Sequence, residues 1–191
     1  MKRPAVPILV IATANAFVGM ELGLAGSGES VLASMFREVR LFPDPLVRHL
    51  PPWDAAFVHH VGFWSHYDES LRESTWPLPA ASTADQLAAF ARERSMLVKS
   101  PRAGDVFLLW NSARGTFSRT GIVVTVEQPG KTMLGRDYEE CVVIEGDTDA
   151  HRTLHGGQVL RHSRRLCPSR GDRFIRWTDA KSKQGTPRMA A

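Results

Sequence analysis

The N-terminal half of the chain places its apolar residues with the period of an α-helix. Residues 8–24 form an apolar stretch that follows Pro7, which the first turn of a helix tolerates, and that runs into a glycine-rich segment. A second apolar pattern at helical spacing spans residues 31–39. We therefore predict two helices before the prolines of residues 43–52, which require an extended connection.

Two further helices are predicted from their start signals. Asp54 follows two prolines and is a strong N-cap residue, so a helix is expected from Asp54 to about residue 67. Thr83 and Gln86 have the spacing of a capping box, which predicts a second helix that ends near Met96.

The pattern changes after Pro101 to short runs of β-branched and aromatic residues between turn-forming residues. Such runs predict strands at residues 105–110, 121–126, 141–145, 159–162 and 174–177. Helices followed by strands indicate an α+β fold, with N-terminal helices packed on a five- to six-stranded antiparallel sheet. We expect a single domain at residues 1–178 and a flexible basic tail at residues 179–191.

Composition restricts the class of protein further. The chain has 191 residues, of which 43% are hydrophobic and 23% charged, and this excludes a wholly disordered, collagen-like or disulfide-framework protein. The net charge of +4 mildly favours anionic partners, but the basic residues are spread out except at residues 161–176. We expect a solvated basic edge there, and nucleic acid is not the favoured partner. No apolar run is long enough to span a membrane.

The N-terminus resembles the start of a secretory signal, because Lys2 and Arg3 precede an apolar stretch at residues 5–12. Asn15 and Glu21 interrupt this apolar character. We therefore expect a first helix of the folded domain, and a protein that is cytoplasmic or exported by a non-classical route.

Four short motifs carry the functional hypothesis. They are WDAAFV at residues 53–58, PRAGDV at 101–106, RTGIV at 119–123 and EGD at 145–147. In this order they resemble the CHAP family, the cysteine, histidine-dependent amidohydrolases and peptidases of the papain-like superfamily, many of which cut peptidoglycan. The corresponding family motifs are Trp-Cys-Ala-x-Phe-Val, Pro-x-x-Gly-Asp-Val, His-Val-Gly-Ile-Val and Glu-Gly-Asn. The resemblance covers roughly residues 8–177 and implies a papain-like fold.

The sequence departs from the family at the catalytic positions. Asp54 stands where the family has its nucleophilic cysteine, and Arg119 where it has its general-base histidine. Glu145 or Asp147 would have oriented the imidazole. A carboxylate is a poor nucleophile toward an amide, and a guanidinium stays protonated, so the family's reaction cannot proceed through these residues. The resemblance therefore implies a pseudoenzyme with no intact catalytic residue.

The resemblance also places the N-terminus of the helix that Asp54 opens against the strand that carries Arg119. The two side chains would then form an ion pair across the old cleft. The alternatives are a plain N-cap role for Asp54 and a surface position on a strand for Arg119. Peptidoglycan fragments or a peptide are the expected ligand, bound by Trp53, Asp54, Arg119, Glu145 and Trp64.

Two other functions remain open. The first is an active cell-wall hydrolase whose nucleophile is altered or displaced, with Cys167 in a basic turn as the thiol to consider; Cys141 is expected in the core. The second is a structural interaction subunit of a larger assembly. His59, His60 and His66 lack the i, i+4 spacing of a zinc pair, so their roles stay open and neither a metal nor a cofactor is predicted.

Overall fold

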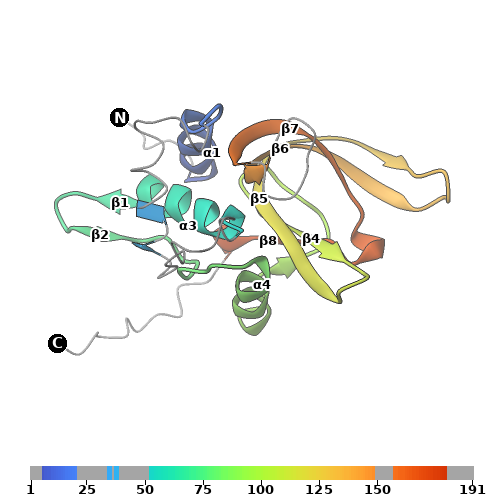
Figure 1. Cartoon of the computed structure of the whole chain (residues 1–191), viewed down its shortest axis with the longest axis horizontal. Helices are drawn as coiled ribbons and strands as arrows, with labels where there is room; N and C mark the ends of the chain where they lie inside the picture. Colours follow the sequence, from blue (N-terminus) through green and yellow to red (C-terminus); the bar gives the residue numbers. More distant parts are fainter. Residues whose placement is uncertain (1–5, 21–33, 36, 39–51, 149–156, 180–191) are drawn as a thin grey trace, which may run out of the picture.

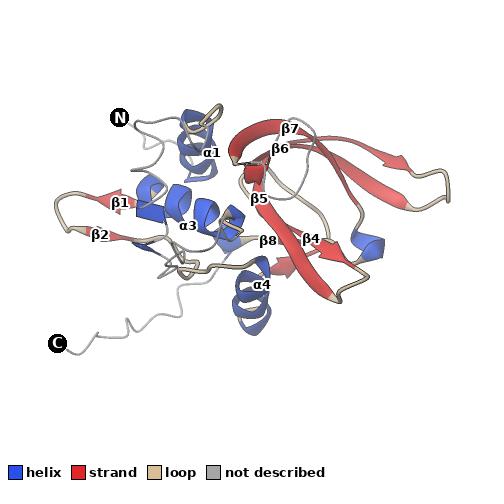
Figure 2. Cartoon of the chain, viewed as in Figure 1, coloured by secondary structure: helices blue, strands red, loops and turns tan. Residues whose placement is uncertain are grey.

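A computed structural model of the chain describes residues 6–20, 34–35, 37–38, 52–148 and 157–179 (Figure 1). Within these ranges three helices pack on a six-stranded antiparallel sheet (Figure 2). The helices are α1 (Val6–Ala16), α3 (Asp54–Ser65) and α4 (Ala84–Glu93). The expected α+β class and antiparallel sheet are confirmed. None of the described helices has the length and apolar character that a membrane span requires.

The large sheet has the strand order β3-β8-β4-β5-β6-β7, and every neighbouring pair is antiparallel. Its strands are β3 (Leu97–Val98), β4 (Val106–Asn111), β5 (Thr116–Lys131), β6 (Asp137–Thr148), β7 (Gln158–Leu166) and β8 (Arg173–Ile175). A small hairpin of β1 (Tyr67–Asp68) and β2 (Glu73–Ser74) follows α3, and short 3₁₀ turns, η1 (Pro168–Arg170) and η2 (Trp177–Asp179), flank β8.

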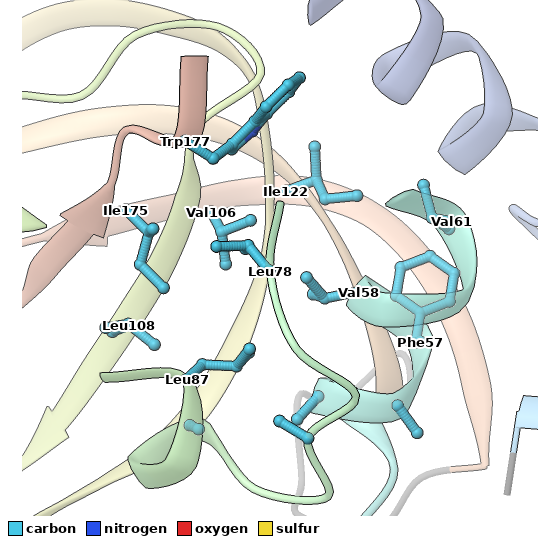
Figure 3. Packing of buried hydrophobic residues seen from close by; sticks show 14 of the residues in the cluster. Phe57, Val58, Val61, Leu78, Leu87, Val106, Leu108, Ile122, Ile175 and Trp177 are labelled. Atoms are coloured by element: carbon cyan, nitrogen blue, oxygen red, sulfur yellow. The ribbon is translucent and has the colours of Figure 1, made fainter. Parts of the chain in front are cut away.

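The main core lies between the helices and one face of the sheet. Figure 3 shows Phe57, Val58 and Val61 of α3 and Leu87 of α4 beside apolar residues of β4, β5 and β8. Side chains of a strand alternate between its two faces. Val106 and Leu108 accordingly join this core, whereas Phe107 between them does not.

A second core occupies the opposite face of the sheet. Its fully buried members all come from strands or their ends: Phe107, Val123, Cys141, Val143, Leu166 and Phe174. Leu166 on β7 and Phe174 on β8 share this core, although β4, β5 and β6 separate their strands in the sheet. The sheet must therefore curl until β7 approaches β8, and the bend of β6 and β7 is visible in Figure 1.

The helix boundaries correct the sequence predictions in part. The first helix ends at Ala16, not at residue 24, because the N–H groups of Phe17 and Val18 donate to carbonyls three residues back and Gly19 takes a φ of +88°. The predicted cap of α4 is confirmed, since Thr83 accepts a hydrogen bond from the Gln86 N–H at 3.2 Å. The Gln86 side chain completes the cap one residue earlier than predicted, by accepting from the Ser82 N–H at 2.8 Å.

The strands are longer than predicted, above all in the β5–β6 hairpin. Both strands extend through mostly polar, exposed or half-buried positions at residues 127–131 and 137–140, where no regular apolar alternation exists to reveal them. The last predicted strand ends at Ile175, and Trp177 belongs to η2. Of the predicted helix at 31–39, only residues 34, 35, 37 and 38 are described, and they are helical. The predicted tail beyond residue 179 lies outside the described residues.

Candidate functional site

Asp54 is the first residue of α3, and its carboxylate crosses to the neighbouring sheet. Its Oδ2 accepts a hydrogen bond from the Thr120 N–H on β5 at 2.7 Å, and only 3% of the residue is exposed. Trp53 occupies the N-cap position and makes no side-chain cap hydrogen bond. The plain N-cap interpretation of Asp54 is therefore wrong. The prediction that the start of this helix lies against the strand of Arg119 is confirmed.

Arg119 is a buried residue of β5 rather than a surface one. It is 4% exposed, and its Nη1 donates to the backbone carbonyl of Asp147 at 2.6 Å. Asp147 is itself buried and has a φ of +56°, at an irregularity of the β6–β7 pairing. The structure thus brings Asp54, Arg119 and Asp147 together from three elements that lie far apart in the sequence.

The electrostatics of this cluster are dominated by burial. Burial raises the pKa of Asp54 from its ordinary 3.8 to about 7. The Arg119 charge and the Thr120 N–H act to lower that pKa, and the nearby Asp147 charge acts to raise it further. Near neutral pH the Asp54 carboxyl is therefore divided between its protonated and ionised forms. Burial thus outweighs the attraction between the Arg119 charge and the Asp54 carboxylate.

Glu145 interacts with side chains of β7 and not with Asp54. Its carboxylate is fully buried and accepts hydrogen bonds from Arg164, through Nε and, at 2.8 Å, through Nη2; the His162 Nε2 lies 3.1 Å away. Burial acts to raise the pKa of Glu145, but His162 and Arg164 outweigh it, so that the pKa is lowered. His162 and Arg164 belong to the segment that the sequence assigned to a solvated basic edge. Their spacing of two residues on a strand was the signal that they share a face.

The five residues expected to bind a ligand do not meet at one accessible surface. Trp53 and Glu145 are fully buried, and Asp54 and Arg119 nearly so. Trp53 belongs to the main core. Its ring packs so closely on Gly146 that a Cβ added there would lie 2.7 Å from it. Trp64 is 47% exposed but lies near the other end of α3, about 15 Å along the helix from Asp54. The described residues around Asp54 thus form a closed polar cluster and no open cleft.

Both cysteines are buried, and burial raises the pKa of each thiol. Burial raises the pKa of the Cys141 thiol to about 12, as expected of a core residue. Cys167 is also buried, and burial together with the Asp172 charge raises its pKa, although it lies in the basic turn. A thiol with a raised pKa carries little thiolate, which is the nucleophilic form.

The three histidines of the α3 region have structural surroundings. The His60 Nδ1 lies 2.9 Å from the Glu38 carboxylate, in a mostly buried ion pair when the ring is protonated. The His66 ring packs 5.3 Å from the ring of Trp76 and 5.2 Å from that of Trp177. Burial lowers the pKa of His59. Within the described ranges, no three His, Cys, Asp or Glu side chains are grouped to hold a metal ion.

Comparison of the chain with protein-family models, with curated proteins and with solved structures gave no match.

Proposed function

We propose that the chain is a CHAP-like domain of papain-like fold that has lost its cysteine–histidine pair and acts as a pseudoenzyme. One observation carries the proposal: the Asp54 carboxylate at the start of α3 bonds to β5 directly beside Arg119. The order of the four motifs predicts this meeting of a helix start and a strand. A chance arrangement of short motifs has no reason to produce it.

The residues at this meeting point do not support amide hydrolysis. Acyl transfer by a cysteine enzyme needs a thiolate and an imidazole that exchanges a proton with it. Asp54 supplies neither group, and the guanidinium of Arg119 does not release its proton near neutral pH. The buried cluster instead joins α3, β5 and β6. The Thr120 N–H of β5 donates to Asp54 of α3, and the Arg119 side chain of β5 donates to the Asp147 carbonyl of β6.

The proposed ligand is a cell-wall fragment or a peptide, as the family resemblance implies. A ligand that reaches Arg119 must first open the closed cluster, because Asp54, Arg119 and Glu145 are buried. This burial favours a second candidate, a domain that serves as an interaction subunit of a larger assembly. Calorimetric titration with purified muropeptides separates the two candidates. Binding that weakens in Arg119→Ala supports the pseudoenzyme with a ligand, and absence of heat supports the interaction subunit.

Restoring the lost pair tests the catalytic half of the proposal. In a dye-release assay on purified cell walls we expect no cleavage by the unmodified protein and little by Asp54→Cys alone. Asp54→Cys combined with Arg119→His should give measurable cleavage if the rest of the cleft is intact and the buried cluster opens to substrate, because an imidazole then accompanies the thiol. Asp54→Cys with Arg119→Lys is the matched control, since it keeps a cation but supplies no base of suitable pKa.

Thiol reactivity separates geometry from access to substrate. A cysteine paired with histidine reacts with a small disulfide reagent well below its ordinary pKa of about 8.5. We expect this shift in the Asp54→Cys, Arg119→His protein and not in the lysine control. The absence of any shift would mean that positions 54 and 119 do not stand as nucleophile and base. Cleavage by the unmodified protein that Cys167→Ala abolishes would establish a displaced thiol and refute the pseudoenzyme.

A further inference from the structure

The strand β7 forms one edge of the six-stranded sheet. It pairs along its length with β6, which is its only partner among the strands that the structure describes (Figure 1). At nine residues it is long for an edge strand, and such an edge presents backbone groups that can pair with another chain. The opposite edge of the sheet is β3, which has two residues.

The direction of the backbone groups along β7 follows from one pair of hydrogen bonds. The Val159 N–H donates to the Met20 carbonyl at 3.0 Å, and the Val159 carbonyl accepts from the Gly19 N–H at 2.9 Å. Val159 therefore directs both groups away from β6. Because this direction alternates along an antiparallel strand, Arg161, Ser163 and Arg165 direct theirs the same way.

These three residues leave a ladder of hydrogen-bonding groups open. In the part of the chain that the structure describes, their N–H groups have no acceptor and their carbonyls no backbone donor. Among the described residues, the hydrogen-bond partner of the Ser163 carbonyl is the His162 Nδ1, at 3.2 Å. The segment at Gly19 and Met20 demonstrates that this edge accepts an added backbone, and among the described residues it pairs with the beginning of β7.

The side chains on the open ladder set the charge of what fits there. Arg161, Ser163 and Arg165 are all exposed. The Arg161 Nη1 donates to the Asn15 Oδ1 at 3.3 Å, and the Arg165 Nε lies 4.0 Å from the Glu140 Oε1, with 65% of the Arg165 side chain exposed. Two arginines four residues apart lie about 13 Å from each other along a strand. Antiparallel pairing with a second copy, centred on Ser163, would place Arg161 opposite Arg165 and is disfavoured by like charge.

We propose that the free edge of β7 binds an extended acidic peptide segment by β-strand addition. The peptide would run antiparallel, as every other pair of the sheet does. Acidic residues at its second and sixth positions would then face Arg165 and Arg161, and a small polar residue at its fourth position would face Ser163. Its odd-numbered residues would lie on the other face of the strand: the first and seventh opposite Leu166 and Leu160, where apolar side chains fit, and the third and fifth opposite Arg164 and His162. A nucleic-acid backbone does not supply the alternating donors and acceptors that this ladder requires. The inference is independent of Asp54 and of the proposed function.

The probe is a fluorescent peptide of about seven residues, with Glu at its second and sixth positions, Thr at the fourth and Val at the others. Fluorescence anisotropy measures its binding to the full chain. N-methylation of the fourth residue removes an N–H that faces β7, and we expect binding to weaken by at least about tenfold. N-methylation of the third residue, whose N–H points away from β7, is the matched control and should leave binding nearly unchanged.

Substitutions in β7 test the same hydrogen bonds from the side of the protein. Ser163→Pro removes an N–H that points away from β6, so the fold should persist, as edge strands tolerate such a proline. We expect Ser163→Pro to weaken binding at least about tenfold and Ser163→Ala to retain it. Arg161→Glu should weaken binding of the acidic peptide, and Lys at the sixth position of the peptide should restore it.

The results that overturn the proposal are equally defined. Binding that is insensitive to both N-methylation sites and to Ser163→Pro, and that salt alone abolishes, means simple charge attraction. Tighter binding of a single-stranded oligonucleotide than of the peptide, unaffected by Ser163→Pro, would assign the surface to a polyanion. A peptide that does not bind the folded chain at all refutes strand addition at this edge.

Discussion

Neutralising Asp54 without changing its shape should make the protein more stable at alkaline pH. Burial raises the pKa of Asp54 from 3.8 to about 7, so the folded chain holds a proton that the unfolded chain has released. Stability due to this group therefore falls as the pH rises from about 4 to about 7. The difference between 3.8 and about 7 corresponds to about 4 kcal/mol, at about 1.4 kcal/mol for each pH unit.

The substitution that removes this titration is Asp54→Asn, which keeps an oxygen to accept from the Thr120 N–H. At about pH 4 the variant and the parent protein should have similar free energies of unfolding. At about pH 8 the variant should be more stable by about 2–4 kcal/mol, the lower figure applying where water enters the site and relieves part of the cost of burial. Urea titrations followed by tryptophan fluorescence at both pH values give the two differences.

Asp85→Asn provides the matched control. Asp85 also accepts a hydrogen bond from a backbone N–H of β5, that of Phe117 at 2.8 Å, but it is exposed. Because Asp85 is exposed, its substitution should not give the gain in stability at about pH 8 that we expect for Asp54→Asn. If Asp54→Asn is instead less stable than the parent at about pH 8, the attraction of Arg119 outweighs burial and the pKa of Asp54 is not raised, which would refute the reasoning.

Two further substitutions test the packing and charge of the same region. Glu145→Gln should lower the free energy of unfolding by about 2–3 kcal/mol at neutral pH because Arg164 loses a buried ionic partner, whereas Glu140→Gln on the same strand should cost less than about 1 kcal/mol. Since the pKa of Glu145 is lowered from 4.5, this cost should shrink as the pH falls through the folded-state pKa; a constant cost in urea titrations would contradict an ionised Glu145. Gly146→Ala should destabilise by about 1–3 kcal/mol, because its Cβ would come within 2.8 Å of both Trp53 and Phe57. A thermal melt unchanged by Gly146→Ala would mean that Trp53 has room to move.

The sequence predicted the meeting of Asp54 and Arg119 but not its surroundings. The motifs locate a helix start and a strand, and both are local features that short patterns encode. The burial of the cluster depends on Gly146, whose missing side chain lets Trp53 and Phe57 approach β6, and no local pattern reveals that contact. The expected cleft was an inference from an enzyme family. In the structure Trp53 and Glu145, which were expected to line it, are fully buried.

Pairing register explains the other differences. The partners of Glu145 lie on β7, and they can be identified only once Val143 is known to pair with His162 and Cys141 with Arg164. The length of the β5–β6 hairpin is likewise set by backbone pairing, because its outer positions are polar on both faces. A sequence pattern shows which side chains are apolar and therefore buried. It does not reveal a strand whose two faces are both exposed to water.

The position of β8 has a consequence for the order in which this chain folds. The strand contains residues 173–175, yet it lies between β3 and β4, and it supplies Ile175 to one core and Phe174 to the other. A chain emerging from the ribosome can form the β4–β5 and β5–β6 hairpins early, since their contacts are local. Neither core is complete until β8 has been synthesised. Before then, β3 lacks β8, with which it pairs in the described structure, and the edge of β4 that pairs with β8 is exposed. Completion of the domain therefore waits until residue 175 has left the ribosome, and a ribosome that stalls before residue 173 holds a chain with exposed apolar surface, a substrate for chaperones.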